Sequence, residues 1–413
     1  MTEAVTKNQA GLVCHIFCKV IDNYGDIGVC WRLARQLVTE HAVDVTLWLD
    51  DLNALQTLLS AGSGTHSNDF SGITDRRVAG VKVRPWLQPA AEELVDMVIE
   101  AFACDLPEAY QHSLAQQEKP PLWINLEYLS AEDWVQDCHA LVSVDPMNGM
   151  RKIFFFPGFV AGTGGLLLEQ GLLQQHDLWQ CSEQQERQQL LASAGVANAD
   201  VARLSQAHSL LISVFTYETG ALASWLGALQ HQPGPVLCLI PEGRVVNSLT
   251  PGSAAGRLLN WSKNDRSERP RPGDRAELGN LVLQVIPFQS QHEYDHLLSL
   301  CDLNLVRGED SFVRAQWAAK PLLWHIYPQQ QEAHLNKLAA FLVLYTHDTS
   351  DSLRQAVQNF WLDWNEGSDC TQSWAQFYYA LTELKSASMK WREKILPVGD
   401  IASNLMNFYK NRL

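Results

Sequence analysis

The chain has 413 residues, 46% of them hydrophobic, so it is long enough for two or three domains with packed cores. Its formal net charge of -15 disfavours nucleic acid and anionic membranes as partners, because an acidic surface repels polyanions. The nine cysteines form no regular framework, the first ten residues lack an apolar signal core, and no apolar run approaches the ~20 residues that span a bilayer. These features predict a cytoplasmic, globular protein.

Two series of short apolar runs predict two α/β layers with parallel strands. The first series alternates with helical or polar stretches, at residues 13–20, 44–49, 80–86, 96–102, 121–126 and 140–145. The second series follows at residues 209–217, 235–241, 281–288, 302–306 and 321–327. We therefore predict an α/β protein with two such domains.

The stretches between and after these runs predict the boundaries. A polar, helix-prone segment suits an interdomain connection, and the chain after Pro328 is expected to be helical. The Pro- and Arg-rich residues 264–279 predict a surface loop. The expected parts are residues 1–182, 183–206, 207–390 and 391–413, the last a C-terminal helix that packs back toward the first domain.

The turn after the first predicted strand carries two acids, Asp22 and Asp26, in the sequence IDNYGDIG. The apolar spacing that follows predicts a helix that starts near Asp26, with Gly25 and Gly28 permitting the tight turn. An N-cap role would explain Asp26 but not Asp22, which follows a strand end and faces the crevice in which open α/β sheets bind ligands. Because no GxGxxG fingerprint is present, the sequence disfavours a dehydrogenase.

Residues 292–296, HEYDH, match the zinc-protease pattern H-E-x-x-H, in which two histidines one helical turn apart share a metal. Apolar neighbours such as Tyr294 and Leu297 place both histidines on the opposite, solvent-facing side of a short helix. We therefore disfavour a zinc hydrolase, for which Glu309 or Glu332 would supply a third ligand.

The segment RGEDS at 307–311 joins a buried strand to an amphipathic helix. The first N–H groups of such a helix, together with its dipole, suit a diphosphate. The alternative is a simple capping sequence with Asp310 or Ser311 as the cap. Acidic side chains would repel a diphosphate, so the backbone should face the phosphates while Glu309 turns toward sugar hydroxyls.

Aromatic residues at strand ends are candidates for stacking on a base. Phe288 could stack on a base, and Gln291, three residues later, could form hydrogen bonds with the edge of that base. Phe215 and Tyr217 end the first strand of the second series, and Tyr327 could donate its hydroxyl to a phosphate. Packing in the core is the alternative for each of these aromatic side chains.

Six segments together resemble the bacterial elongation factor P arginine rhamnosyltransferases, the EarP family: IDNYGDIGVCWRLARQL, INLEYLSAEDW, FFFPGF, FTYE, IPFQSQ and VRGEDSFVRAQWAAKPLLWHIYPQ. The resemblance covers essentially the whole chain. It implies a GT-B fold, with two Rossmann-like domains facing across a cleft, the first for the protein acceptor and the second for the nucleotide sugar. It implies transfer of L-rhamnose from dTDP-β-L-rhamnose to one arginine of elongation factor P. The product bond would be α, so the anomeric centre is inverted, and the modification would activate that factor for rescue of stalled ribosomes.

The resemblance also assigns roles to residues. The family's paired aspartates, both essential for turnover there, match Asp22 and Asp26, and its acidic loop residue matches Glu309, so these three are the expected catalytic residues. Phe288 would stack on the thymine with Gln291 beside the base. The donor site as a whole matches Phe215, Tyr217, Phe288, Gln291, Arg307, Glu309, Asp310, Ser311 and Tyr327.

The expected chemistry uses no metal or other cofactor. A guanidinium group has a pKa above ~12 and delocalised lone pairs, so it is a poor nucleophile that two carboxylates can bind and polarise. We expect Asp26 to act as base or principal activator and Asp22 to orient it, although a helix N-terminus should lower the pKa of Asp26. Electrostatic activation with late proton loss is the alternative. The competing functions are a GT-B enzyme with another acceptor and a nucleotide-binding module without turnover.

Overall fold

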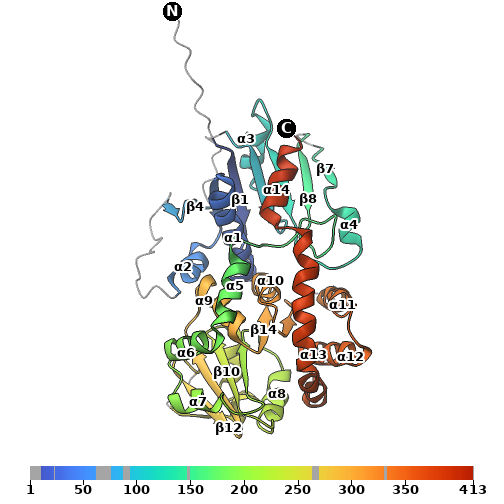
Figure 1. Cartoon of the computed structure of the whole chain (residues 1–413). Helices are drawn as coiled ribbons and strands as arrows, with labels where there is room; N and C mark the ends of the chain where they lie inside the picture. The colour runs from blue at the N-terminus through green and yellow to red at the C-terminus, as the bar shows by residue number, and fades with distance from the viewer. Residues whose placement is uncertain are drawn as a thin grey trace, which may run out of the picture. The chain divides into compact units, whose positions relative to one another are not determined.

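The computed structural model describes residues 11–22, 24–61, 76–86, 94–146, 149–262, 269–329 and 333–412. The chain divides into two compact units (Figure 1). The first unit comprises Met1–Thr57, Asp69–Gln170 and Val398–Leu413, and the second comprises Leu58–Asn68 and Gly171–Pro397. Each unit is built around one sheet flanked by helices.

The first unit contains an eight-stranded sheet in the order β3-β4-β2-β1-β5-β6-β8-β7. Its six inner strands run parallel, and β3 and β7 pair antiparallel at the two edges. The strands are β1 Val13–Cys18, β2 Asp44–Leu49, β3 Arg76–Val78, β4 Val81–Pro85, β5 Met97–Ala101, β6 Leu122–Leu126, β7 Val142–Val144 and β8 Arg151–Phe155. The helices are α1 Tyr24–His41, α2 Leu52–Ser60, α3 Glu108–Ala115, α4 Trp134–Cys138 and α14 Ile401–Lys410.

Aromatic packing and one long-range contact hold the first unit together. Phe17 of β1 stacks on Trp48 of β2, with ring centroids 5.6 Å apart, because both strands are buried at the centre of the sheet. The C-terminal helix α14 lies beside α1 (Figure 1). There the Gln36 amide donates a hydrogen bond of 2.8 Å to Asp400, which joins residues from the two ends of the chain.

The second unit contains a seven-stranded sheet in the order β11-β12-β13-β10-β9-β14-β15. The five strands from β13 to β15 in this order are parallel, whereas β11 and β12 continue the sheet antiparallel. The strands are β9 Leu210–Val214, β10 Val236–Pro241, β11 Asn260–Trp261, β12 Arg275–Leu278, β13 Leu281–Ile286, β14 Leu303–Arg307 and β15 Leu322–His325.

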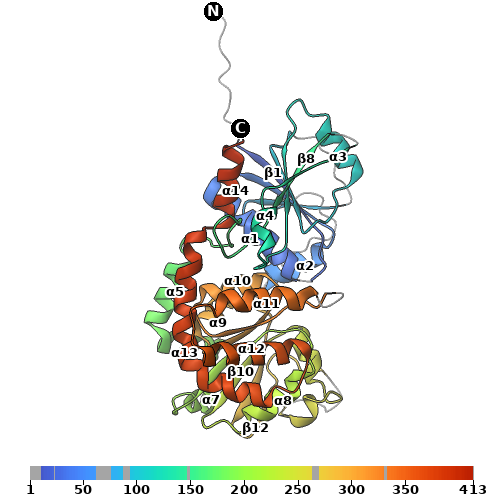
Figure 2. The same ribbon diagram turned by 90° about the vertical axis from the view of Figure 1, so that its right-hand side faces the viewer.

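Helices cover this sheet and make up the last part of the chain. α12 and α13 pack against each other and against α8 (Figure 2). At that contact the edges of Trp364 and Trp374 meet the ring of Trp225 at 5.4 and 5.7 Å. The helices are α5 Leu172–Cys181, α6 Glu183–Ser193, α7 Asn198–Arg203, α8 Ala221–Leu229, α9 Gln291–Leu300, α10 Asp310–Trp317, α11 Ala333–Tyr345, α12 Asp351–Glu366 and α13 Thr371–Ile395, with short 3-10 turns at Arg244–Leu249, Gly256–Leu258 and Leu396–Val398.

The apolar runs located the central strands correctly, and the helical prediction after Pro328 is confirmed by α11 to α14. The prediction of a surface loop over 264–279 is wrong for its last part, since Arg275–Leu278 is the antiparallel strand β12, which pairs with β11 and β13; residues 264–268 lie outside the described residues. The sequence also missed β8. The expected connection at 183–206 forms α6 and α7 within the second unit, where Arg275 binds Asp200 at 2.6 Å.

Over the described ranges, no helix combines the length and the apolar character that crossing a membrane requires.

Candidate functional site

The predicted acids of the first unit lie where β1 meets α1. The helix begins at Tyr24, so Asp26 lies in its first turn and is not the N-cap. Gly25 and Gly28 also lie inside the helix, so of the two glycines expected to permit the tight turn only Gly25 takes part in it. The capping explanation for Asp26 therefore fails.

Asp26 binds the chain that leads into its own helix. Its Oδ2 atom accepts hydrogen bonds from the backbone N–H groups of Ile21 and Asp22, each at 2.9 Å. Two bonds to one oxygen fix the orientation of the carboxylate and bring Asp22 close to it. We refer to Val20, Ile21, Asp22 and Asp26 as the carboxylate turn.

The electrostatic state of Asp26 differs from the prediction. Only 4% of this residue is exposed, and burial raises the pKa of its carboxyl above the ordinary value. The N–H groups of Asp22 and Ile21 lower that pKa in part, and the nearby charge of Asp50 raises it further. The expectation that the helix N-terminus leaves Asp26 with a lowered pKa is wrong, because burial outweighs the donors. A raised pKa makes a carboxylate a better proton acceptor.

Gly25 allows the side chain of Asp22 to lie against the start of α1. The Gly25 N–H donates to the Asp22 carbonyl oxygen at 2.7 Å, which closes the turn. A Cβ atom added at Gly25 would lie 2.6 Å from Asp22 Oδ2. No real Cβ makes so close a contact, so glycine here is required by the position of the carboxylate.

In the second unit, the predicted donor-site residues gather at one edge of the sheet. Phe215 and Tyr217 follow β9, Phe288 follows β13, Arg307 ends β14 and Tyr327 follows β15. These strands are parallel, so their carboxyl ends share an edge, the edge at which open α/β sheets bind ligands. We refer to these five residues as the aromatic–arginine cluster.

Arg307 is the centre of this cluster. Its guanidinium carbon lies 4.7 Å from the ring centroid of Phe215 and 5.0 Å from that of Tyr217. The ring centroids of Phe288 and Phe215 are 6.2 Å apart, and Tyr327 meets Tyr217 edge-on at 5.6 Å. Arg307 is only 5% exposed, and its Nη1 atom is buried with no hydrogen-bond partner in the described part of the chain. A buried, incompletely bonded cation of this kind suits an anionic ligand.

The turn from Arg307 into α10 uses a left-handed glycine. Gly308 has φ of +60°, and Glu309 is the N-cap of α10 without a side-chain capping bond. Neither Asp310 nor Ser311 is the cap, so that alternative is wrong. The Ser311 hydroxyl instead donates to the Arg307 carbonyl and accepts from the Arg307 N–H at 3.0 Å, which ties the helix to the strand end.

Two further predicted residues meet beside this helix start. The Gln291 amide nitrogen, at the start of α9, lies 3.4 Å from Asp310 Oδ2. Glu309 and Asp310 are both half-buried, so neither is withdrawn into the core. The second unit therefore brings the predicted residues at 215, 217, 288, 291, 307, 309–311 and 327 to one region, the five parallel strand ends and the helix starts that follow them.

The HEYDH segment forms the first turns of α9 and is used for packing. Tyr294 and Leu297 are buried, as predicted. Asp295 is also buried and forms a two-pronged ion pair with Arg314 of α10, at 2.9 and 2.8 Å. His292 is exposed, but His296 is half-buried and bonds Glu186 at 2.9 Å, so its predicted place in solvent is wrong. Burial lowers the pKa of His296, and Glu186 partly offsets this effect.

Metal ligands of the usual kinds do not gather anywhere in the described residues: they include no group of three or more His, Cys, Asp or Glu side chains placed to hold a metal ion. Glu332, one of the two third ligands considered for a zinc site, lies outside the described residues.

Sequence reasoning missed three polar residues that contact the candidate site. Arg244, in the 3-10 turn after β10, lies 5.5 Å from the Tyr217 ring and pairs with Glu218 at 2.8 Å. His325, at the end of β15, meets Tyr217 edge-on at 5.2 Å; burial, together with the charge of Arg307, lowers its pKa to about 3. The third is Asp50, directly after β2. Arg244 and Asp50 follow the ends of parallel strands and His325 is the last residue of one, but that position alone does not distinguish a site residue from a cap or a core residue.

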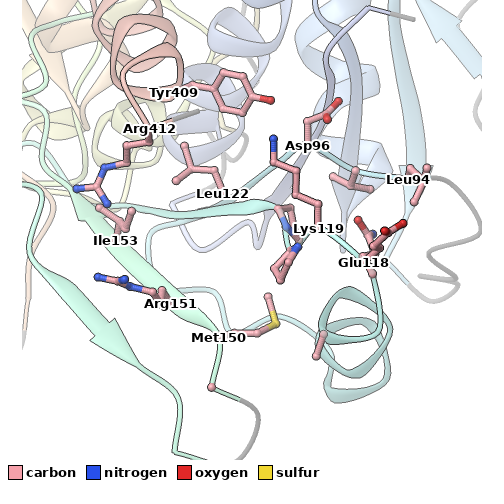
Figure 3. Close-up of a pocket in the computed structure, with 16 residues that line it drawn as sticks. Leu94, Asp96, Glu118, Lys119, Leu122, Met150, Arg151, Ile153, Tyr409 and Arg412 are labelled. Carbon is pink, nitrogen blue, oxygen red and sulfur yellow. The ribbon is translucent and has the colours of Figure 1, made fainter.

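A cavity of about 680 Å³ in the first unit is separate from the candidate site (Figure 3). Asp96, Leu122 and Arg151 line it, and they lie at the amino ends of β5, β6 and β8. Asp22 follows the carboxyl end of β1, which is parallel to β5, so the cavity and the carboxylate turn lie at opposite edges of the sheet. None of the predicted site residues lines this cavity.

Known proteins are similar to this chain over nearly its full length. Residues 14–410 match the family model described as elongation factor P (EF-P) rhamnosyltransferase EarP. The protein-arginine rhamnosyltransferase of Pseudomonas putida is 45% identical over 401 residues, which cover 96% of this chain and 98% of the relative. The protein of the same description from Pseudomonas aeruginosa is 43% identical over 399 residues, which cover 96% and 99%.

A solved structure agrees with the sequence comparison. It concerns EarP-mediated arginine glycosylation of translation elongation factor EF-P, is 32% identical, and covers 97% of this chain and 99% of its own with a TM-score of 0.63. Together with the two α/β units and the helical C-terminal segment, this likeness shows the predicted α/β GT-B fold. The chain belongs to the EarP family of elongation factor P rhamnosyltransferases.

Proposed function

We propose that the protein transfers L-rhamnose from dTDP-β-L-rhamnose to an arginine side chain of elongation factor P, with inversion at the anomeric carbon. Relatives named protein-arginine rhamnosyltransferases that match nearly the whole chain support the enzyme class and the amino acid modified. In the structure, the strongest support is the buried Asp26, fixed beside Asp22 at the end of β1. Because the proposed acceptor is a translation factor, the reaction would take place in the cytoplasm.

The carboxylate turn supplies the acceptor half of the proposed reaction. A guanidinium is a permanent cation with delocalised lone pairs, so two carboxylates can bind it and localise electron density on one nitrogen. Asp22 orients the group, and Asp26 accepts the proton that the attacking nitrogen loses. Its raised pKa suits this step, since proton transfer to a weakly basic carboxylate would be unfavourable.

The aromatic–arginine cluster and the start of α10 supply the donor half. Phe288 stacks on the thymine and Gln291 binds the edge of the base. Phe215 and Tyr217 support Arg307, whose buried cation binds the diphosphate with Tyr327. The first backbone N–H groups of α10, at Asp310 and Ser311, face the same anion, and Glu309 binds sugar hydroxyls.

The bond changes balance without a metal or another cofactor. The guanidinium nitrogen forms a bond to C1 of rhamnose while the bond from C1 to the diphosphate oxygen breaks, and dTDP leaves with its new charge bound by Arg307 and the helix start. The nitrogen proton passes to Asp26. Attack from the face opposite the leaving group gives the α-linked product.

The test is to incubate the protein with dTDP-β-L-rhamnose and elongation factor P and to weigh the acceptor. We expect a mass increase of one deoxyhexose that maps to arginine, persists in excess chelator, and shows an α-anomeric signal by NMR. An acceptor with its target arginine replaced by lysine is the control and should gain no mass. No increase, or an increase on another residue type, would contradict the proposal.

A further inference from the structure

Asp50 occupies a position next to the carboxylate turn. β1 and β2 are neighbouring parallel strands, and Cys18 at the end of β1 pairs with Leu49 at the end of β2. The chain that leaves β2 therefore emerges beside the chain that leaves β1. Asp50 is the first residue after β2, and its Oδ1 atom accepts a hydrogen bond from the backbone N–H of Val20 at 2.9 Å.

This bond completes a set of three. The consecutive N–H groups of Val20, Ile21 and Asp22 each donate to a carboxylate, the first to Asp50 and the other two to Asp26. The segment that carries Asp22 is thus held from two sides, by α1 and by the end of β2. Without the bond to Asp50, only the two bonds to Asp26 would remain of this set, and both come from the α1 side.

We propose that Asp50 is a positioning residue of the active site, which holds the carboxylate turn through Val20 and whose negative charge strengthens Asp26 as a proton acceptor. The proposal rests on the proposed function, because it assumes that Asp26 accepts the proton of the acceptor arginine. It adds a third carboxylate, which need not contact either substrate, to the two acids of the turn.

The groups that face Asp26 come from three elements. Asp22 lies in the turn, Asp50 follows β2, and Cys18 ends β1. A hydrogen bond with Cys30 of α1 and burial raise the pKa of the Cys18 thiol well above its usual value, so this thiol is neutral and adds no charge. Burial and the charge of Asp50 both raise the pKa of Asp26, against the two backbone N–H groups. Among the described residues that shift the pKa of Asp26, Asp50 supplies negative charge from outside the turn.

The adjacent residue offers a matched control. The Asp51 Oδ1 atom accepts from the N–H groups of Asn53 and Ala54 at 2.8 and 3.4 Å, so Asp51 caps the start of α2. Two consecutive acids thus point to different parts of the unit. Asp51→Asn removes the same charge as Asp50→Asn, one residue further along the chain, without touching the carboxylate turn.

The experiment measures kcat/KM for rhamnosylation against pH. Activity requires ionised Asp26, so it falls as pH drops through the pKa of this group. Asp50→Asn keeps an oxygen for Val20 but removes the charge, and we expect its acidic limb to move to lower pH and its kcat at the optimum to fall about two- to threefold, because Asp26 is then a weaker proton acceptor. Asp50→Ala also loses the bond, and its kcat should fall about five- to tenfold in addition. Asp51→Asn should leave the acidic limb of the pH profile at the same pH as in wild type.

Two results would overturn the proposal: an acidic limb of Asp50→Asn that coincides with wild type, or an equal shift in Asp51→Asn, which would indicate only a change in surface charge. NMR of the protein labelled with ¹³C at aspartate carboxyls separates this test from the proposed function. The Asp26 signal, assigned by its loss in Asp26→Asn, should titrate at lower pH in Asp50→Asn whether or not the protein transfers rhamnose. If wild type transfers no sugar, the proposed function fails, and the titration still decides the role of Asp50.

Discussion

The carboxylate turn of the first unit and the aromatic–arginine cluster of the second lie at equivalent places in their sheets, yet they carry opposite charge. Each follows the carboxyl ends of central parallel strands, and each includes one charged side chain that is almost fully buried, Asp26 at 4% and Arg307 at 5% exposure. Under the proposed function, the same strand-to-helix geometry binds a cation in one unit and an anion in the other. The side chains at the strand ends, and not the fold, decide which.

The two buried charges are stabilised by different means. Backbone N–H groups bind the Asp26 carboxylate, whereas aromatic ring faces lie against the Arg307 guanidinium. Ring faces attract a cation without using all of its N–H donors, which leaves donors for a ligand. The bonds to Asp26 occupy one oxygen, Oδ2. Each charge is therefore held in place by the protein and can also serve a substrate.

The largest effect is expected for Asp26→Asn. The amide oxygen can still accept from Ile21 and Asp22, so the turn should keep its shape, but the variant cannot take a proton. We expect kcat to fall about a thousandfold, the scale of a lost general base, with dTDP affinity unchanged. Turnover assays and calorimetric titration of dTDP measure the two quantities. Loss of dTDP binding would show that the carboxylate turn belongs to the donor site, which would contradict the assignment of donor and acceptor to different units.

Arg307→Met is the matching change in the second unit. Methionine keeps most of the length and packs between the rings, but it cannot bind an anion. We expect the affinity for dTDP to fall about ten- to hundredfold, the scale of hydrogen bonds to a charged group. Arg307→Lys should recover part of this loss, because it keeps the charge without the planar fork. Unchanged dTDP binding in Arg307→Met would contradict the assignment of the aromatic–arginine cluster to the donor site.

Gly25→Ala tests how closely the carboxylate turn is fitted to its helix. Alanine favours a helix over glycine by about 1 kcal/mol, so we expect the free energy of unfolding not to decrease. The Cβ must displace the Asp22 carboxylate, which lies 2.6 Å away, and we expect kcat to fall about tenfold through misplacement of that acid. Gly227→Ala in α8 is the control, since a Cβ there meets nothing within 4 Å. Full activity of Gly25→Ala would mean that the position of Asp22 is not critical.

The smallest effect is expected for the double variant His292→Ala and His296→Ala. Neither side chain belongs to the carboxylate turn or to the aromatic–arginine cluster, and His292 is exposed. Turnover should stay within about twofold of wild type, as for substitutions on the surface. Metal content and turnover are the measurements. Loss of a bound metal together with loss of turnover would favour the zinc-hydrolase interpretation of HEYDH.

Much of the fold could be predicted from sequence because buried parallel strands are continuous apolar runs, such as VCHIFC in β1 and LVLQVI in β13. Short antiparallel strands near the edge of a sheet do not have this pattern. β12, with the sequence RAEL, lies between β13 and the two-residue edge strand β11, and its charged residues are typical of a loop. β8, with the sequence RKIFF, begins with two charged residues, so its apolar part is too short to indicate a strand.

Some residues of the candidate site could likewise be predicted from the sequence and others could not. Asp22, Asp26 and the RGEDS segment could be found because strand ends and helix starts leave a sequence signal. Asp50 could not, because two consecutive acids before a helix are typical of a cap, and only the structure shows that one caps α2 while the other binds Val20. The raised pKa of Asp26 also escaped prediction, since the extent of burial depends on packing that sequence spacing does not give.

A crystal structure with dTDP bound tests the central claim most directly, because it shows which region holds the donor. The account predicts the thymine against Phe288 and the diphosphate at Arg307 and the first N–H groups of α10, with the carboxylate turn free of nucleotide. A nucleotide bound at Asp22 and Asp26, or a diphosphate away from Arg307, would contradict it.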